Sequence, residues 1–143
     1  MEVDLRRILF LVAALCPWPA WAQSLSSNEF AAFAPEKIGQ TVTINSCYAA
    51  NASSAGVDCV TFAPAQHSND LNWSVIIPID GNSIDRPSLL RALNNCADLN
   101  RRTECQVSVT GTVYDAMADM GIQGDHSYAL KNATLKWLSP TPN

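Results

Sequence analysis

The sequence predicts a mainly β domain with one or two helices, and two observations carry that prediction. Apolar and polar residues alternate from Cys105 to Tyr114, which is the period of a strand with one face buried. Other short runs are rich in β-branched residues and are bounded by segments of turn composition. A longer core-facing helix is indicated around residues 86–99, where Leu89, Leu93, Cys96 and Leu99 share one helical stripe.

The first 22 residues have the features of a secretory signal peptide. Arg6 and Arg7 precede an apolar run at residues 8–16 that is too short to span a bilayer. Ala20-Trp21-Ala22 then supplies small residues at the two positions that signal peptidase requires, so cleavage is expected before Gln23. The sequence therefore predicts a signal peptide at 1–22 and one domain at 23–143, secreted or periplasmic, with no transmembrane segment in the mature chain.

The charge balance argues against a nucleic-acid ligand. The formal net charge of the chain is −4, and it stays at −4 after cleavage because the signal peptide carries two basic and two acidic residues. Binding to phosphates requires clustered lysines and arginines, whereas Arg101-Arg102 is the only close basic pair in the mature chain.

In the amino-terminal half, the pattern predicts a short helix followed by three strands. Residues 26–33 have a capped helical pattern that ends at Pro35, and a strand begins at residues 41–44. Residues 49–56 have loop composition, and a second strand covers residues 57–62. The third strand covers residues 73–79, with Pro78 marking an edge or a bulge.

In the carboxyl-terminal half, the pattern predicts a helix and then two strands. Ser83-Ile84-Asp85-Arg86-Pro87 supplies a cap and a first-turn proline for the helix. The alternating strand from Cys105 follows, then a loop at residues 115–127. In the last strand, residues 129–138, the apolar phase shifts between Leu130 and Ala133, which indicates a bulge.

Four cysteines remain after cleavage, and their even number in an exported domain indicates two disulfides. Their count allows three pairings. The predicted local structure favours Cys47–Cys59 within a hairpin and Cys96–Cys105 at the corner between helix and strand. No Cys-x-x-Cys pair or two-plus-two zinc pattern is present, and we expect neither a metal nor a cofactor.

Five strands with a helix between strands 3 and 4 are the order of a five-stranded OB-fold-like Greek-key barrel. The phrases "GQTVTI", "CQVSVTGTV" and "ALKNATLKW" resemble the secreted bacterial OB-fold proteins of the tRNA-anticodon-binding-like group. The resemblance spans most of residues 25–138. It implies the fold and an extracytoplasmic bacterial setting, while the group has no single activity.

An OB barrel usually binds ligands between the loop that joins strands 1 and 2 and the loop that joins strands 4 and 5. Tyr48, Tyr114 and His126 flank that region and are the candidate ligand-binding residues, since aromatic side chains suit a sugar, a peptide or another flat ligand. Trp73 also borders it, although core packing is the favoured interpretation for this residue.

Three classes of function follow from these observations. The first is a binding or interaction module without catalytic activity, whose partner is a protein, peptide or glycan. The second is a glycan-binding subunit that resembles the receptor-binding subunits of bacterial toxins. The third is a small hydrolase that uses His126 with Asp125 or Asp119, which lacks an identifiable nucleophile.

Overall fold

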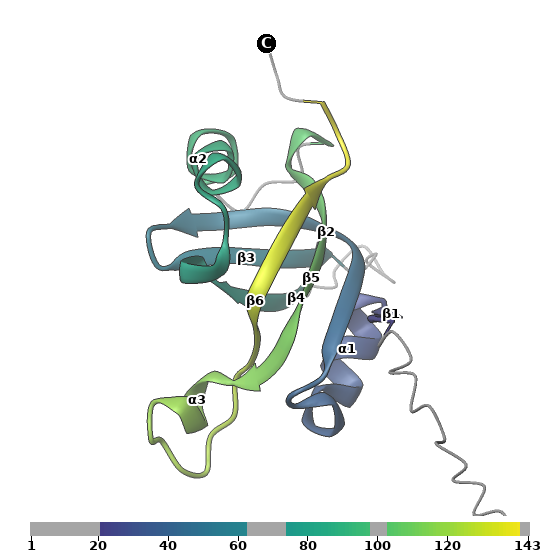
Figure 1. Cartoon of the computed structure of the whole chain (residues 1–143), viewed down its shortest axis with the longest axis vertical. Coiled ribbons are helices and arrows are strands. Elements are labelled where there is room, and N and C mark those ends of the chain that lie inside the picture. The colour runs from purple at the N-terminus through teal and green to yellow at the C-terminus, as the bar shows by residue number, and fades with distance from the viewer. Residues whose placement is uncertain (1–20, 63–73, 98–102, 141–143) are drawn as a thin grey trace, which may run out of the picture.

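In a computed structural model of the chain, the described residues form one sheet of six strands, with three α-helices at its margins (Figure 1). The structure describes residues 21–62, 74–97 and 103–140. The predicted signal peptide up to residue 20, Trp73 and Leu99 lie outside the described residues. The strands are β1 (Gln23–Leu25), β2 (Thr41–Ser53), β3 (Gly56–Phe62), β4 (Ser74–Asp80), β5 (Gln106–Asp115) and β6 (Tyr128–Trp137). The helices are α1 (Ser27–Phe33), α2 (Arg86–Asn95) and α3 (Ala116–Asp119), with 3₁₀ turns η1 (Ala34–Lys37), η2 (Gly81–Ser83) and η3 (Thr103–Cys105).

The strands are paired in the order β1-β2-β3-β4-β6-β5, and β5 also pairs with β2. The mainly β class predicted from the sequence is therefore correct. β1 was not predicted from the sequence. It is a three-residue strand that pairs in parallel with the start of β2. Between β4 and β6, which are parallel, the described residues share one register pair, Ile79 with Leu130. The junction of β4 and β6 is therefore weakly paired.

β2 is longer than predicted and takes part in two antiparallel ladders. Its first half pairs with β5, its second half pairs with β3, and its register shifts between Ile44 and Cys47. The prediction of a loop at residues 49–56 is wrong, because Ala49 and Ala50 are fully buried residues of β2. The connection to β3 is the two-residue turn between Ser53 and Gly56. Burial against the core overrides the low strand propensity of these small residues.

Predicted features of β5 and β6 are confirmed. Val107, Val109 and Val113 are fully buried, as the alternation in this segment predicts. The bulge in β6 is present, since Thr110 pairs with Thr134 whereas Thr112 pairs with Lys131. The residue between these two threonines is Gly111, where an added Cβ would lie 3.1 Å from the Cβ of Ala133. The close approach of the two strands at the bulge therefore favours glycine.

Small residues form the buried face of α2. Asp85 caps the helix by accepting a hydrogen bond from the backbone N–H of Ser88 (2.9 Å). Ser88, Ala92 and Cys96 are buried, while Leu89 and Leu93 are half-buried. Cys96 faces the core as predicted, whereas Ser88 and Ala92 take the buried positions predicted for Leu89 and Leu93, because small side chains at successive turns allow the helix backbone to approach the strands closely.

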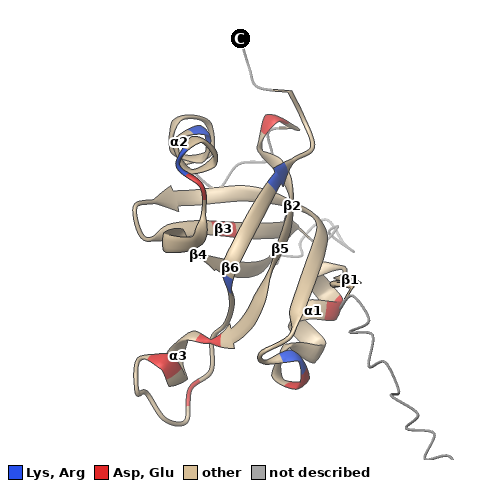
Figure 2. Cartoon of the chain, viewed as in Figure 1, with Lys and Arg blue, Asp and Glu red and all other residues tan. Residues whose placement is uncertain are grey.

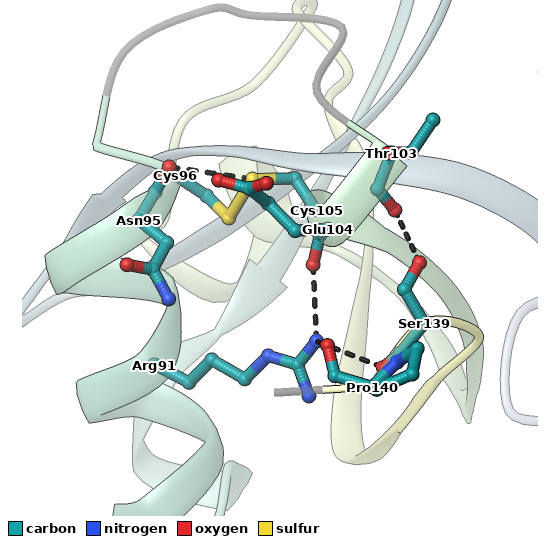
Figure 3. The surroundings of a disulfide bond; sticks show 8 residues. All are labelled: Arg91, Asn95, Cys96, Thr103, Glu104, Cys105, Ser139 and Pro140. Carbon is teal, nitrogen blue, oxygen red and sulfur yellow. Dashed lines mark hydrogen bonds between the residues drawn. A yellow bond between two sulfur atoms is a disulfide. The ribbon is translucent and has the colours of Figure 1, made fainter. Parts of the chain in front are cut away.

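Both disulfides expected from the sequence are present in the structure, Cys47–Cys59 and Cys96–Cys105. The Cys96–Cys105 bond joins the end of α2 to the start of β5 (Figure 3). Close to it, Arg91 Nη2 lies 2.9–3.1 Å from three backbone carbonyl oxygens, those of Glu104, Ser139 and Pro140. The guanidinium also stacks over Trp137, 4.0 Å from the ring centroid. These contacts fasten α2 to the chain after β6.

α1 lies beside β2 and β4 (Figure 1). Its first turn has a capping box: the backbone N–H of Ser26 donates to Glu29 Oε2 (2.7 Å), and the Glu29 N–H donates to Ser26 Oγ (3.2 Å). The α-helix ends at Phe33, just before Pro35, as the sequence predicts, and the separate 3₁₀ turn η1 follows it. Phe30 and Ala34 are buried, so this helical segment is fixed against the sheet.

Candidate functional site

An open cleft of about 440 Å³ lies beside the weakly paired junction of β4 and β6. Phe30, Ala31 and Ala34 line one side, residues 75–78 of β4 form another, and His126, Ser127 and Tyr128 complete the wall. Most of this lining is apolar, and the side chains that can make hydrogen bonds come from residues 126–128. An apolar surface with few, adjacent polar groups is the usual composition of a ligand-binding cleft.

Asp115 organises the polar wall of the cleft. It ends β5 on the buried face of that strand, and its side chain is 8% exposed. Its Oδ1 accepts hydrogen bonds from the backbone N–H groups of Met117 (3.1 Å), Ala118 (3.5 Å) and Ser127 (3.1 Å). Asp115 therefore caps α3 and closes the segment between β5 and β6, in the way that an aspartate satisfies free N–H groups at a helix start.

The second carboxylate oxygen of Asp115 fixes His126. The distance from Asp115 Oδ2 to His126 Nδ1 is 2.6 Å. This hydrogen bond lowers the pKa of Asp115 below its ordinary value, and the backbone hydrogen bonds lower it further against the opposing effect of burial. Because the carboxylate is ionised at neutral pH and can only accept, Nδ1 carries the ring hydrogen and donates a hydrogen bond to Asp115 Oδ2. Nε2 is then the ring nitrogen left for a ligand.

The imidazole of His126 is accessible at the cleft. Its side chain is 61% exposed. The ring is nearly parallel to that of Tyr128, with an interplanar angle of 5° and a centroid separation of 5.9 Å. An oriented, solvent-accessible imidazole beside a phenol gives this wall a directional hydrogen-bonding edge.

The three predicted ligand-binding residues do not form one platform. Tyr48 is in register with Gln106 at the start of β5, whereas Tyr114 is near the end of that strand. The Tyr48 ring lies near Phe62, with centroids 6.1 Å apart, and Lys131 Nζ lies 4.9 Å from the Tyr114 ring. Of the three, His126 lines the cleft. The separation arises because β2 and β5 are antiparallel, so Tyr48 lies opposite the start of β5 whereas Tyr114 lies near its end.

The partner of His126 also differs from the expected one. Asp119 contacts Lys131 Nζ at 3.4 Å, and the carboxylate bonded to His126 Nδ1 belongs to Asp115 rather than Asp119 or Asp125. The signal for Asp115 was available in the alternating strand, where it occupies the same face as Val113. An aspartate at an inward position requires partners, which the β5–β6 connection supplies.

No known protein family, curated protein or solved structure matches this chain. Within the described ranges, no helix is both long enough and apolar enough to cross a membrane. The same part of the chain contains no group of three or more His, Cys, Asp or Glu side chains placed to hold a metal ion.

Acidic residues gather at the α3 end of the molecule, whereas α2 carries basic residues (Figure 2). Asp115 ends β5 and is buried, while Asp119 and Asp125 lie in the segment between β5 and β6 and are exposed. The cleft therefore opens close to negative charge, which disfavours an anionic ligand through like-charge repulsion.

Proposed function

We propose that residues 23–143 form an exported binding module with an OB-fold-like barrel and no catalytic activity, and that the cleft beside His126 is its ligand site. The strand pairings support the barrel. In the order β2, β3, β4, β6, β5, each strand pairs with the next, and β5 then pairs with β2. Along the chain, α2 lies between β4 and β5, which are the third and fourth strands of the proposed barrel, and this is where an OB-fold has its helix.

Export is supported by two independent features of the chain. The first is the signal-peptide pattern of residues 1–22. The second is the pair of disulfides, which persist in oxidising compartments and are rare in the cytosol.

The Asp115–His126 pair at the wall of the apolar cleft is the observation that carries the binding proposal. The proposed ligand is a peptide segment that places an apolar side chain between α1 and β4. A neutral His126 would accept a hydrogen bond from the peptide through Nε2. A peptide fits this site better than a glycan, because the many hydroxyls of a sugar need more polar partners than the apolar lining offers.

The test is a binding screen of the purified exported protein on peptide and glycan arrays, followed by affinity measurements on variants. His126→Ala is expected to weaken peptide binding about tenfold, the effect of one lost hydrogen bond of roughly 1.4 kcal/mol. Ile76→Asp, in the cleft, is expected to abolish binding, because the ligand's apolar side chain would have to cover a charge.

Leu90→Asp is the matched control, since Leu90 is 47% exposed on α2 and Ile76 is 48% exposed on β4. We expect Leu90→Asp to bind like the wild type. Binding that survives both cleft substitutions would contradict the assignment of the site. A glycan ligand together with a ring-shaped oligomer would instead favour the toxin-like alternative, and substrate turnover lost in His126→Ala would favour the hydrolase.

A further inference from the structure

The first strand, β1, begins at the residue that signal cleavage would expose. β1 starts at Gln23, and its register pairs are Gln23 with Val42, Ser24 with Thr43 and Leu25 with Ile44. Leu25 is buried in the core and anchors the strand. Cleavage before Gln23 therefore retains every pairing of β1, and it makes a glutamine the amino-terminal residue of the mature domain.

We propose that the mature protein carries an amino-terminal pyroglutamate at position 23. The inference rests on the predicted cleavage before Gln23. In the reaction, the α-amino nitrogen of Gln23 attacks the carbonyl carbon of its own side-chain amide. A new C–N bond closes the pyrrolidone ring, the bond from that carbon to the amide nitrogen breaks, and ammonia leaves. No oxidant or reductant is consumed.

The surroundings of Gln23 permit this cyclisation. Gln23 is exposed, so its side chain can fold back on its own amine. The adjoining surface hollow is lined by Trp21, which leaves with the signal peptide, and by Gly39, Gln40 and Thr41, none of which carries a carboxylate that could hold a terminal ammonium in an ion pair. An α-amino group has an ordinary pKa of about 8, so a reactive neutral fraction exists near neutral pH.

The modification would have two consequences for β1. It removes one positive charge, while the ring nitrogen keeps an N–H that can donate to a neighbouring strand. It also blocks aminopeptidases, which require a free α-amine. β1 is a short edge strand of the sheet, so trimming from the terminus would remove pairings that cover the start of β2.

The experiment is to express the complete chain in a host that exports it and to measure the intact mass of the purified protein without reduction. The expected mass is that of residues 23–143 with two disulfides, less one ammonia. Amino-terminal sequencing should be blocked, and treatment with pyroglutamyl aminopeptidase should unblock it and reveal Ser24 as the first residue. The matched control is Gln23→Ala, which should retain a free amine and give a readable amino-terminal sequence.

The outcomes separate cleavage from cyclisation. A chain that begins at Gln23 but keeps its free amine, even after incubation with a glutaminyl cyclase, would overturn the pyroglutamate while leaving the cleavage site intact. A chain that begins at any other residue would overturn both. Neither result depends on ligand binding at the cleft, so this test is independent of the proposed function.

Discussion

Asp115 is a buried carboxylate with four hydrogen-bond donors, from His126 and from the backbone of Met117, Ala118 and Ser127. A buried charge is tolerated when its oxygens are fully satisfied, and removal of such a partner costs more than removal of an exposed one. We expect Asp115 to serve two purposes. It holds the β5–β6 connection closed, and it fixes the proton of His126 on Nδ1.

This environment predicts a dependence of stability on pH. The pKa of Asp115 is lowered in the folded protein from the ordinary value of 3.8 that applies in the unfolded chain. The ionised side chain therefore stabilises the fold at pH values above 3.8, and this contribution is lost as the pH falls through the lower, folded pKa. Asp115→Asn should be less stable than the wild type near neutral pH, and the difference should shrink on acidification below 3.8.

Urea unfolding of both proteins over a series of pH values measures this difference. Asp125→Asn is the control, because Asp125 is exposed and neighbours His126 in the sequence. It is expected to change the free energy of unfolding little at any pH. A difference between wild type and Asp115→Asn that stays constant down to strong acid would show that the carboxylate is not stabilised in the fold.

The connection from β5 to β6 has two parts: a base fixed by the hydrogen bonds of Asp115, and an exposed tip farther from the strands. Met120 and Ile122 are large apolar residues that remain exposed, and Gly121 and Gly124 adopt positive φ angles. The tip therefore contributes little buried apolar area. The fixed base consists of Asp115 and the residues that donate to it.

Replacement of residues 119–125 by an equal-length Gly/Ser segment should lower the melting temperature by only a few degrees, because most changes at exposed positions shift the free energy of unfolding by less than about 0.5 kcal/mol in either direction and partly cancel. Replacement of residues 116–126 should cost more, since it also deletes His126 and leaves Asp115 with one donor fewer. Differential scanning calorimetry of the two variants compares them directly. Equal losses would mean that the hydrogen bond from His126 contributes nothing to stability.

At the scale of the whole molecule, the two disulfides connect different kinds of neighbours. Cys47–Cys59 links strands that are already paired within one hairpin. Cys96–Cys105 links α2 to β5 and thus holds a helix against the sheet. A bond that closes a loop of this short length stabilises by about 2 to 3 kcal/mol.

Cys96→Ala combined with Cys105→Ala should therefore lower the free energy of unfolding by about 2 to 3 kcal/mol and make the amides of α2 exchange faster than those of β5. The matched variant, Cys47→Ala with Cys59→Ala, should leave exchange in α2 protected. Hydrogen exchange followed by mass spectrometry resolves the two segments. Similar protection of α2 in both variants would show that Arg91 and its contacts hold the helix without the disulfide.

By itself, the sequence determined the mainly β class, the inward face of β5, the bulge in β6 and the two cysteine pairs. Each follows from local physics: a strand alternates with a period of two, and cysteines a few residues apart across a turn or corner can meet. The tertiary structure alone decided that Ala49 and Ala50 are strand residues, that Ser88 and Ala92 form the buried face of α2, and that Asp115 orients His126. The first two depend on burial by strands distant in the chain, which overrides the weak local preference of small side chains. The third depends on how the β5–β6 connection folds, because that fold decides which of the nearby aspartates reaches His126.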